Sequence, residues 1–327
     1  MSAPGQPLVT IAVPTYNRAA TLERTLASAL GQTHRELELV VSDQASTDGT
    51  ERLCRALAAA DARVRYLRQP TNAGGSTANF NLLAAELRGP YAMLLADDDW
   101  LQPDYVERCL RLLVERPELA VAYGRARYFD GDRHVADGRL HDHLEEAPAA
   151  RVTTYYRTVD DNGVMYGLMR ADALRGALPM PNVLGNDWLL MGRVAAAGKI
   201  ATIERTHVDR AVGGTSASVE KIVQTFGISK LQARLPHLTV AWQVLADVGW
   251  RSPAFASLPR AQRLRTALLS ALGAINWRSL AYHAFGPLIE RAGRLPGLRW
   301  TSRALAAVRR RFGGDGVLTP PPGEADR

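Results

Sequence analysis

Short apolar runs alternate with amphipathic segments along the first hundred residues of the chain. The apolar runs predict β-strands at residues 8–13, 37–41, 64–67 and 91–95. The segments between them predict helices at residues 21–30, 50–60 and 77–87. In the first helix Thr21 is the expected N-cap. Regular alternation of strand and helix is typical of βαβ units, so we predict an α/β, Rossmann-like fold with a largely parallel central sheet flanked by helices.

The second half of the chain carries a less regular pattern. It predicts helices at residues 105–115 and 182–197, strands at 119–124 and 199–204, and further helices over about 219–248. Residues 130–146 are polar and predict a long loop or a hairpin. His141 and His143 in this segment have the chemistry of metal ligands, but a solvated loop is the favoured interpretation. Ser252-Pro253 marks a predicted boundary before a C-terminal helical extension.

Three carboxylates follow the fourth predicted strand, at Asp97, Asp98 and Asp99. The carboxyl ends of parallel strands meet at one edge of the sheet, where open α/β folds bind ligands. Because adjacent carboxylates repel one another, a divalent cation is expected to hold them, and Mg²⁺ or Mn²⁺ prefers carboxylate and phosphate oxygens. The alternative is an acidic turn before the helix that opens at Pro103-Asp104.

Charge is distributed unevenly over the 327 residues. The net charge is +7. From Arg251 onward there are 13 Arg, no Lys and four acidic residues, which gives +9 and leaves −2 for the first 250 residues. Arginines alternate there with leucines such as Leu264 and Leu268, a pattern that fits either an anionic membrane surface or helices packed on the main domain. No zinc spacing, RNP-type motif or recognition helix accompanies the charge, so we expect no nucleic-acid partner.

The N-terminus, the apolar segments and the cysteines indicate where in the cell the protein is expected. The first seven residues lack the basic and apolar parts of a signal peptide, and no uncharged apolar stretch reaches about 18 residues. Cys54 and Cys109 lie in helical patterns beside leucines, which predicts core packing and no disulfide framework. We therefore expect a cytoplasmic protein, either free or associated with the inner face of a membrane. Residues 313–327 are predicted to be disordered.

With these residues placed, the sequence resembles the family 2 glycosyltransferases, which are inverting, GT-A-fold enzymes, over about residues 7–218. The motifs that carry the resemblance are Pro14-Thr15-Tyr16-Asn17-Arg18, Asp43 with Ser46 and Asp48-Gly49-Thr50, Asn72-x-Gly74 with Asn79, Asp97-Asp98-Asp99, and Asn186-Asp187-Trp188. The domains implied are a GT-A domain at 1–218, a basic helical extension at 219–312 and a tail at 313–327.

The resemblance implies a role for each motif. The first four motifs would surround the nucleotide-sugar donor, with Asp43 near the base and Asp97 near the ribose or base. Asp99 would hold the metal ion. Asp187 would be the general base, with Asn186 and Trp188 beside the acceptor.

The sequence also departs from the pattern of these relatives. Ser42 replaces a first Asp, Ala78 an Arg, Asn186 an acid, and Val212 a His that some relatives use. The absence of a Gln-x-x-Arg-Trp motif and of a pair of membrane spans makes the processive synthases a poor match.

These observations favour one function over two others. The expected activity is transfer of a single sugar from a UDP-, GDP- or dTDP-sugar to a glycan, a lipid-linked saccharide or a small-molecule glycoside. A catalytically inactive nucleotide-sugar-binding protein is the first alternative. A sugar nucleotidyltransferase ranks lower, because such enzymes carry a Gly-rich, basic loop where this chain has Thr15-Tyr16-Asn17-Arg18.

Overall fold

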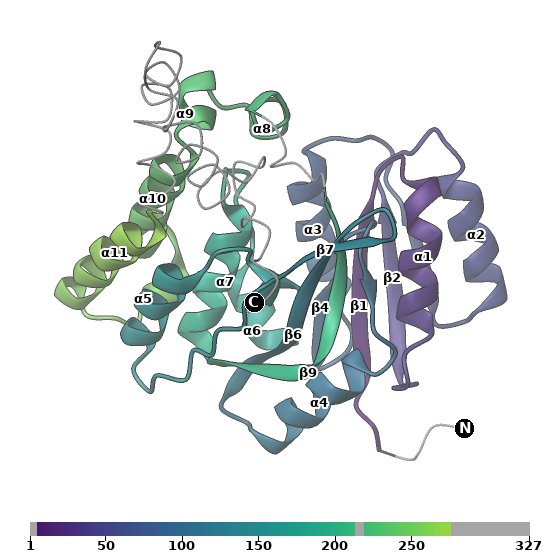
Figure 1. The fold of residues 1–327 in the computed structure, drawn as a ribbon, viewed down its shortest axis with the longest axis horizontal. Helices are drawn as coiled ribbons and strands as arrows, with labels where there is room; N and C mark the ends of the chain where they lie inside the picture. Colours follow the sequence, from purple (N-terminus) through teal and green to yellow (C-terminus); the bar gives the residue numbers. More distant parts are fainter. Residues whose placement is uncertain (1–4, 213–218, 276–327) are drawn as a thin grey trace, which may run out of the picture.

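A single mixed sheet forms the centre of the computed structural model, which describes residues 5–212 and 219–275. The strand order is β3-β2-β1-β4-β8-β6-β9-β5, and β7 pairs with β6. Figure 1 labels β1, β2, β4, β6, β7 and β9 of this sheet. The strands are β1 Val9–Thr15, β2 Leu37–Asp43, β3 Val64–Arg68, β4 Tyr91–Leu94, β5 Trp100–Leu101, β6 Leu119–Asp130, β7 Arg133–Asp137, β8 Leu168–Arg170 and β9 Lys199–Ala211. β3, β2, β1 and β4 are mutually parallel, which confirms the predicted βαβ half.

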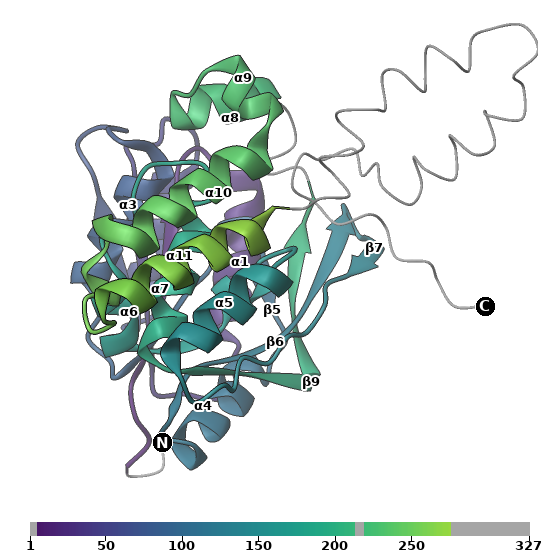
Figure 2. The ribbon, with the colours of Figure 1, turned by 90° about the vertical axis from the view of Figure 1, so that its left-hand side faces the viewer.

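Helices cover both faces of this sheet, as Figures 1 and 2 show. They are α1 Ala19–Leu30, α2 Thr50–Ala60, α3 Gly75–Ala85, α4 Tyr105–Glu115, α5 Pro148–Thr158, α6 Ala171–Ala177, α7 Asn186–Ala197, α8 Val219–Phe226, α9 Lys230–Arg234, α10 Pro236–Ala246 and α11 Arg260–Ala274. Short helical turns cover Gly163–Tyr166 (η1), Asp247–Arg251 (η3, a π-helix) and Pro253–Phe255 (η4).

Alternating residues of the central strands fill two separate cores. On β1, Val9, Ile11 and Val13 pack with α1, α2 and α4, whereas Ala12 faces the core that contains α3 and α7. Because both faces are covered, all seven residues of β1 are buried, and the strand reads in sequence as a nearly continuous apolar run.

The first helix begins earlier than predicted. The backbone N–H of Arg18 donates to Thr50 Oγ1, and that of Ala19 donates to Asp48 Oδ2. These contacts satisfy N–H groups at the start of the helix, so α1 begins at Ala19 and Thr21 lies inside it. The prediction of Thr21 as N-cap was therefore wrong.

β6 and β9 are both about twice as long as predicted, and a register shift divides their pairing. Gly124 pairs with Ile203, and the next residue, Arg125, pairs with His207. At this shift a Cβ on Gly124 would lie 2.4 Å from the Thr206 carbonyl oxygen, so only glycine permits the close approach of the strands. The polar second half of β9 then runs on to Ala211, beside the carboxyl edge of the parallel strands.

The segment predicted as a loop or hairpin contains the β6–β7 hairpin. His143, in the same segment, is buried rather than solvated. Its backbone pairs with Ile200, and its ring contacts Tyr155 edge-on at 5.6 Å between centroids. No group of three or more His, Cys, Asp or Glu suited to a metal ion occurs within residues 5–212 and 219–275.

The helices after residue 218 share their core with the α/β domain. Val240, Val244 and Phe255 belong to the same buried cluster as Val121 of β6, and α11 lies beside α5 and α10 (Figure 2). The predicted division at residue 218 stays a prediction, and residues 276–327, which include the last part of the predicted extension and all of the predicted tail, lie outside the described residues. Cys54 and Cys109 are buried free thiols, as predicted. In the described part of the chain, no helix is long and apolar enough to span a bilayer.

Candidate active site

The loops that follow β1 and β2 are bonded into one rim at the carboxyl edge of the sheet. The Asn17 backbone N–H donates to Ser46 Oγ at 2.8 Å, and Asn17 Oδ1 accepts from the Thr47 backbone N–H at 2.8 Å. Asn17 and Ala45 both adopt positive φ, at 52° and 59°. Non-glycine residues in this conformation are uncommon and cluster at functional sites, so the rim is a specified feature of the fold.

The motif at residues 14–18 begins with buried residues and ends with exposed residues at this edge of the sheet. Pro14 and Thr15 end β1 inside the sheet, whereas Tyr16, Asn17 and Arg18 are exposed on the rim. The last three therefore present their side chains where a ligand at this edge would lie.

Asp43 organises the buried side of the rim. Its Oδ1 accepts from the backbone N–H of Ser46 at 2.9 Å, and its Oδ2 accepts from Tyr66 Oη at 2.6 Å and Arg68 Nη1 at 2.9 Å. The side chain is fully buried, so its observed contacts are all with the protein. The expectation that Asp43 contacts a nucleotide base stays a prediction, and its partner Arg68 was not anticipated from the sequence.

The third motif shapes the loop before α3. Gly74 is the N-cap of α3 at φ 78°, and a Cβ there would lie 2.6 Å from that of Ala78. Asn72 is exposed on this loop. Asn79 is fully buried and donates from Nδ2 to the Ser42 carbonyl at 2.8 Å, which ties α3 to β2. The observed contact of Asn79 is therefore with backbone.

Asp97 and Asp98 face the exposed rim residue Arg18. The Arg18 guanidinium lies 3.6 Å from Asp97 Oδ1 and 3.8 Å from Asp98 Oδ2. Burial, and after it the charge of Asp98, raise the pKa of Asp97 to about 6, although the charge of Arg18 acts in the opposite direction. This is the electrostatic situation in which an added cation is stabilising.

Asp99 is more deeply buried and has partners on β9. Its Oδ1 accepts from the Ala211 backbone N–H at 2.9 Å, and its Oδ2 lies 3.4 Å from Arg210 Nε. Burial raises the pKa of Asp99 to about 7 against the opposing charge of Arg210. The Arg210 guanidinium also packs over the Tyr166 ring, 4.4 Å from its centroid. Sequence reasoning missed Arg210, because it lies 111 residues from Asp99 along the chain.

The oxygen donors at this edge fit a metal ion that arrives with a diphosphate. Asp98 is partly exposed, and Asp99 Oδ2 lies 3.4 Å from Arg210 Nε, so one or two carboxylates could contribute an oxygen to an ion. Mg²⁺ is usually held by one or two carboxylates together with substrate phosphates. The chemistry of the donor set is therefore suited to such an ion and not to a cage built from protein ligands alone.

The last motif opens α7 on the other side of this edge. Gly185, the N-cap at φ 79°, packs against Val240 of α10 so closely that a Cβ would lie 2.8 Å from it. Asn186 donates from Nδ2 to Thr77 Oγ1 at 2.8 Å. Asp187 is partly buried, and its Oδ2 accepts from Asn162 Nδ2 at 2.9 Å. Trp188, expected beside an acceptor, is only 7% exposed and lies in the core, so its burial argues for a packing role.

One turn connects Asp187 with the carboxylates after β4. Arg210, which contacts Asp99, donates from Nη1 to the Asp161 carbonyl oxygen at 3.3 Å. The following residue, Asn162, holds Asp187. The structure thus joins the two groups of acids that the sequence singled out through the turn at residues 160–162, which sequence reasoning did not identify.

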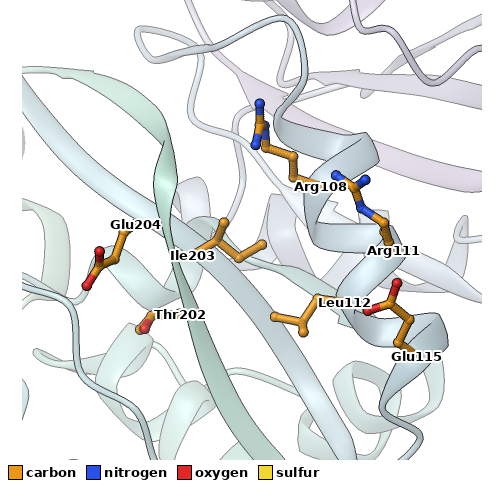
Figure 3. Close-up of a pocket in the computed structure, with 7 residues that line it drawn as sticks. All are labelled: Arg108, Arg111, Leu112, Glu115, Thr202, Ile203 and Glu204. Carbon is orange, nitrogen blue, oxygen red and sulfur yellow. The ribbon is translucent and has the colours of Figure 1, made fainter.

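A separate open hollow lies between α4 and β9 (Figure 3). Its lining contains Arg108, Arg111, Leu112, Glu115, Thr202, Ile203 and Glu204. It contains none of the motif residues. We therefore place the candidate site at the carboxyl edge of the parallel strands and not in this hollow.

Comparison with solved structures assigns the fold class. Residues 1-349 of S. aureus TarS in complex with UDP-GlcNAc superpose with a TM-score of 0.53 at 14% identity, covering 91% of each chain. The mannosyltransferase PcManGT from Pyrobaculum calidifontis, in complex with GDP-Man and Mn²⁺, gives a TM-score of 0.51 at 16% identity, covering 94% of this chain and 87% of that one. The fold is therefore the GT-A fold predicted from the sequence.

The family follows from sequence comparison. The model described as glycosyl transferase family 2 matches residues 10–175, just over half of the chain. The chain belongs to glycosyl transferase family 2, as its motifs indicated.

Among curated relatives, the hyaluronan synthase of Pasteurella multocida is 28% identical over 221 residues, 66% of this chain and 22% of that protein. The chondroitin synthase of Escherichia coli is 38% identical over 129 residues, 39% of this chain and 18% of that protein. This chain thus spans less than a quarter of the length of either synthase.

Proposed function

We propose that this protein is an inverting, metal-dependent glycosyltransferase that moves a single sugar from a nucleoside-diphosphate sugar to an acceptor hydroxyl. The observation that carries the proposal is the link between Asp99 and Asp187 through the turn at residues 160–162. It ties a carboxylate suited to the diphosphate side of the reaction to one suited to the acceptor side. The family assignment supports the same chemistry.

The donor is assigned to the rim built by the first four motifs. Tyr16 and Arg18 are exposed there, and Arg18 already faces the two carboxylates that would lie beside the ribose and the diphosphate. The full set of proposed donor residues is Pro14, Thr15, Tyr16, Asn17, Arg18, Asp43, Ser46, Asn72, Gly74, Asn79, Asp97 and Asp98.

Asp99, with Asp98 next to it, would hold Mg²⁺ or Mn²⁺. Such an ion, when bound, supplies positive charge against the negative charge that grows on the departing diphosphate. The similarity to PcManGT, whose structure contains Mn²⁺, supports this proposal.

Asp187 is the proposed general base. The acceptor hydroxyl must lose its proton as it attacks the anomeric carbon, and a positioned base typically contributes ~10²–10⁴-fold to the rate. Asp187 stands in the first turn of α7 and is partly exposed, so the proton can pass to its carboxylate. Attack from the side opposite the diphosphate inverts the anomeric configuration. Asn186 lies next to the base and is assigned to the acceptor side. Trp188 is largely buried and could contact the acceptor only through the edge of its ring.

The relatives support particular classes of donor and acceptor. TarS is seen with UDP-GlcNAc and PcManGT with GDP-Man, which supports a UDP- or GDP-sugar as the donor ahead of a dTDP-sugar. The hyaluronan and chondroitin synthases support a sugar-containing acceptor. The presence of both Asp99 and Asp187 argues against an inactive nucleotide-sugar-binding protein, and the family argues against a nucleotidyltransferase.

The decisive experiment is Asp187→Asn in the full chain. A thermal-shift screen of UDP, GDP and dTDP with Mn²⁺ first identifies the nucleotide, and release of that diphosphate is then followed with a panel of sugar acceptors. We expect the variant to bind the nucleotide as the wild type does and to lose ~10²–10⁴-fold in kcat.

Asp172→Asn is the matched control, because Asp172 also stands in the first turn of a helix but is almost fully exposed. Equal kcat in Asp187→Asn and the wild type would remove Asp187 from its role. Tight nucleotide binding without turnover of any donor would favour the inactive binding protein.

We also propose peripheral contact with an anionic membrane surface, at the inner face in a cytoplasmic location, through α10 and α11. α11 turns small residues such as Ala267 and Ala271 inward and exposes Leu264 and Leu268 by 58% and 55%. Between residues 230 and 275 there are six basic residues and one acid, Asp247, which is buried. A surface that is both apolar and uniformly basic suits anionic lipid headgroups.

A further inference from the structure

Asn162 is a buried amide with two partners that fix its orientation. Its Nδ2 donates to Asp187 Oδ2 at 2.9 Å, and its Oδ1 accepts from Tyr155 Oη at 2.9 Å. A carboxylate can only accept, whereas a phenol can donate, so the amide nitrogen must face Asp187. Because Asn162 is only 4% exposed, water does not compete freely for these bonds.

The backbone at Asn162 is held in an uncommon conformation. Its φ is 49° and its ψ is 33°, the left-handed region in which Asn, Asp and Gly are the best-tolerated residues. Arg210 of β9 binds the carbonyl of the preceding residue, Asp161, and Tyr155 of α5 binds the Asn162 side chain. The turn is thus fixed from two elements, although it belongs to neither.

We propose that Asn162 is a positioning residue that holds the carboxylate of Asp187 in one rotamer, with Oδ2 engaged and Oδ1 left for the acceptor hydroxyl. This inference rests on the proposed role of Asp187 as base. A neutral amide suits the task, because a guanidinium in its place would stabilise the carboxylate anion more strongly and make it a weaker base. A base must also lie within hydrogen-bond reach of the proton that it takes, and a free rotamer would lose that geometry.

Two substitutions at Asn162 separate positioning from electrostatics. Asn162→Gly keeps the left-handed backbone and removes the amide, and we expect kcat to fall ~10–100-fold at every pH. Asn162→Asp keeps the shape but places a second carboxylate against the base. Repulsion then favours the protonated base, so we expect kcat to fall at neutral pH and the acid limb of its pH profile to move to higher pH.

The pH profile can be interpreted because the neighbouring groups are known. The phenols of Tyr155 and Tyr156 interact with Asp187, and burial raises the pKa of each well above its usual range, so both stay protonated during the assay. Asp160 and Asp161 stand on the same turn as Asn162 and are unchanged in both variants.

The assay measures kcat, the KM for the donor and the nucleotide-induced shift in Tm for the full-length variants. We expect the KM and the Tm shift to match the wild type. The double variant Asn162→Gly/Asp187→Asn should be no slower than Asp187→Asn alone, because a positioning residue has nothing left to position. A merely structural role would instead add its loss to that of Asp187→Asn.

Wild-type kcat in both Asn162 variants, or a loss confined to donor KM, would overturn the inference. Failure of the proposed function is a distinct result, since it would appear as full activity in Asp187→Asn, whatever the Asn162 variants do.

Discussion

A buried ion pair between Arg193 and Asp247 connects α7 with the helices that follow residue 218. Arg193 Nε lies 3.0 Å from Asp247 Oδ2, and Nη2 lies 2.5 Å from Oδ1, so the pair is bidentate. Arg193 Nη1 also donates to the carbonyl oxygens of Ala177 at 2.9 Å and Pro179 at 2.7 Å. Both charged side chains are more than nine-tenths buried.

Arg193→Met should therefore be strongly destabilising. Removing one member of a buried pair leaves the other charge uncompensated, at a cost of about 3–5 kcal/mol. The two carbonyls that lose their donor add ~1 kcal/mol each if no other donor reaches them. With a sensitivity of roughly 2–4 °C per kcal/mol for a domain of this order of size, a total loss of about 5–7 kcal/mol should lower Tm by ~10–28 °C.

Thermal unfolding measures the change in Tm and urea unfolding the change in free energy of unfolding, both followed by circular dichroism, with two variants as references. Arg193→Met/Asp247→Leu removes the stranded charge and should regain most of the lost stability. Arg55→Met breaks an exposed pair with Glu51 and should change the free energy of unfolding by less than ~0.5 kcal/mol. A Tm within ~2 °C of the wild type for Arg193→Met, or separate unfolding of the C-terminal helices alone, would show that α7 does not depend on them.

Two further predictions concern pH and membranes. Burial lowers the pKa of His143 to about 4 from its ordinary value of 6.5. As the pH falls, the unfolded state therefore binds a proton before the folded state does. Up to ~3 kcal/mol of the stability present above pH ~6.5 is lost as the pH falls to ~4. His143→Phe should flatten the pH dependence of Tm over this range, and an unchanged slope would contradict the assignment. Leu264→Gln/Leu268→Gln should weaken co-sedimentation with phosphatidylglycerol vesicles at least ~10-fold. Equal binding of the wild type to phosphatidylcholine vesicles, or full binding of the double variant, would refute the proposed membrane contact.

The parallel half of the fold could be predicted because its signals are local. β1, β2 and β4 are buried on both faces and therefore appear as short, mainly apolar runs. The antiparallel half lacks such a signal. β8 has only three residues, Leu168–Arg170, and is defined by its partners β4 and β6. The second halves of β6 and β9 are partly polar, since one side of them faces solvent or the site.

The residues of the candidate site could likewise be predicted only where their sequence signal is local. Sequence motifs identified the acids after β4 and at the start of α7, because each stands next to a recognisable strand end or helix start. Arg210 and Asn162 could not be found in this way, since their importance comes only from contacts with residues 111 and 25 positions away. Trp188 was assigned to the acceptor from its neighbour in the motif, whereas its place on the inner side of α7 puts it in the core.

The glycine at position 124 affects how this enzyme tolerates genetic variation. Because Gly124 has no side chain, β9 can pair closely with β6 through the register shift and then continue to the carboxyl edge of the parallel strands, where Arg210 contacts Asp99. Even an added methyl group would press on the Thr206 carbonyl and displace everything that follows it on β9. Inactivating alleles should therefore be found at codon 124, although this position contributes no atom to the chemistry.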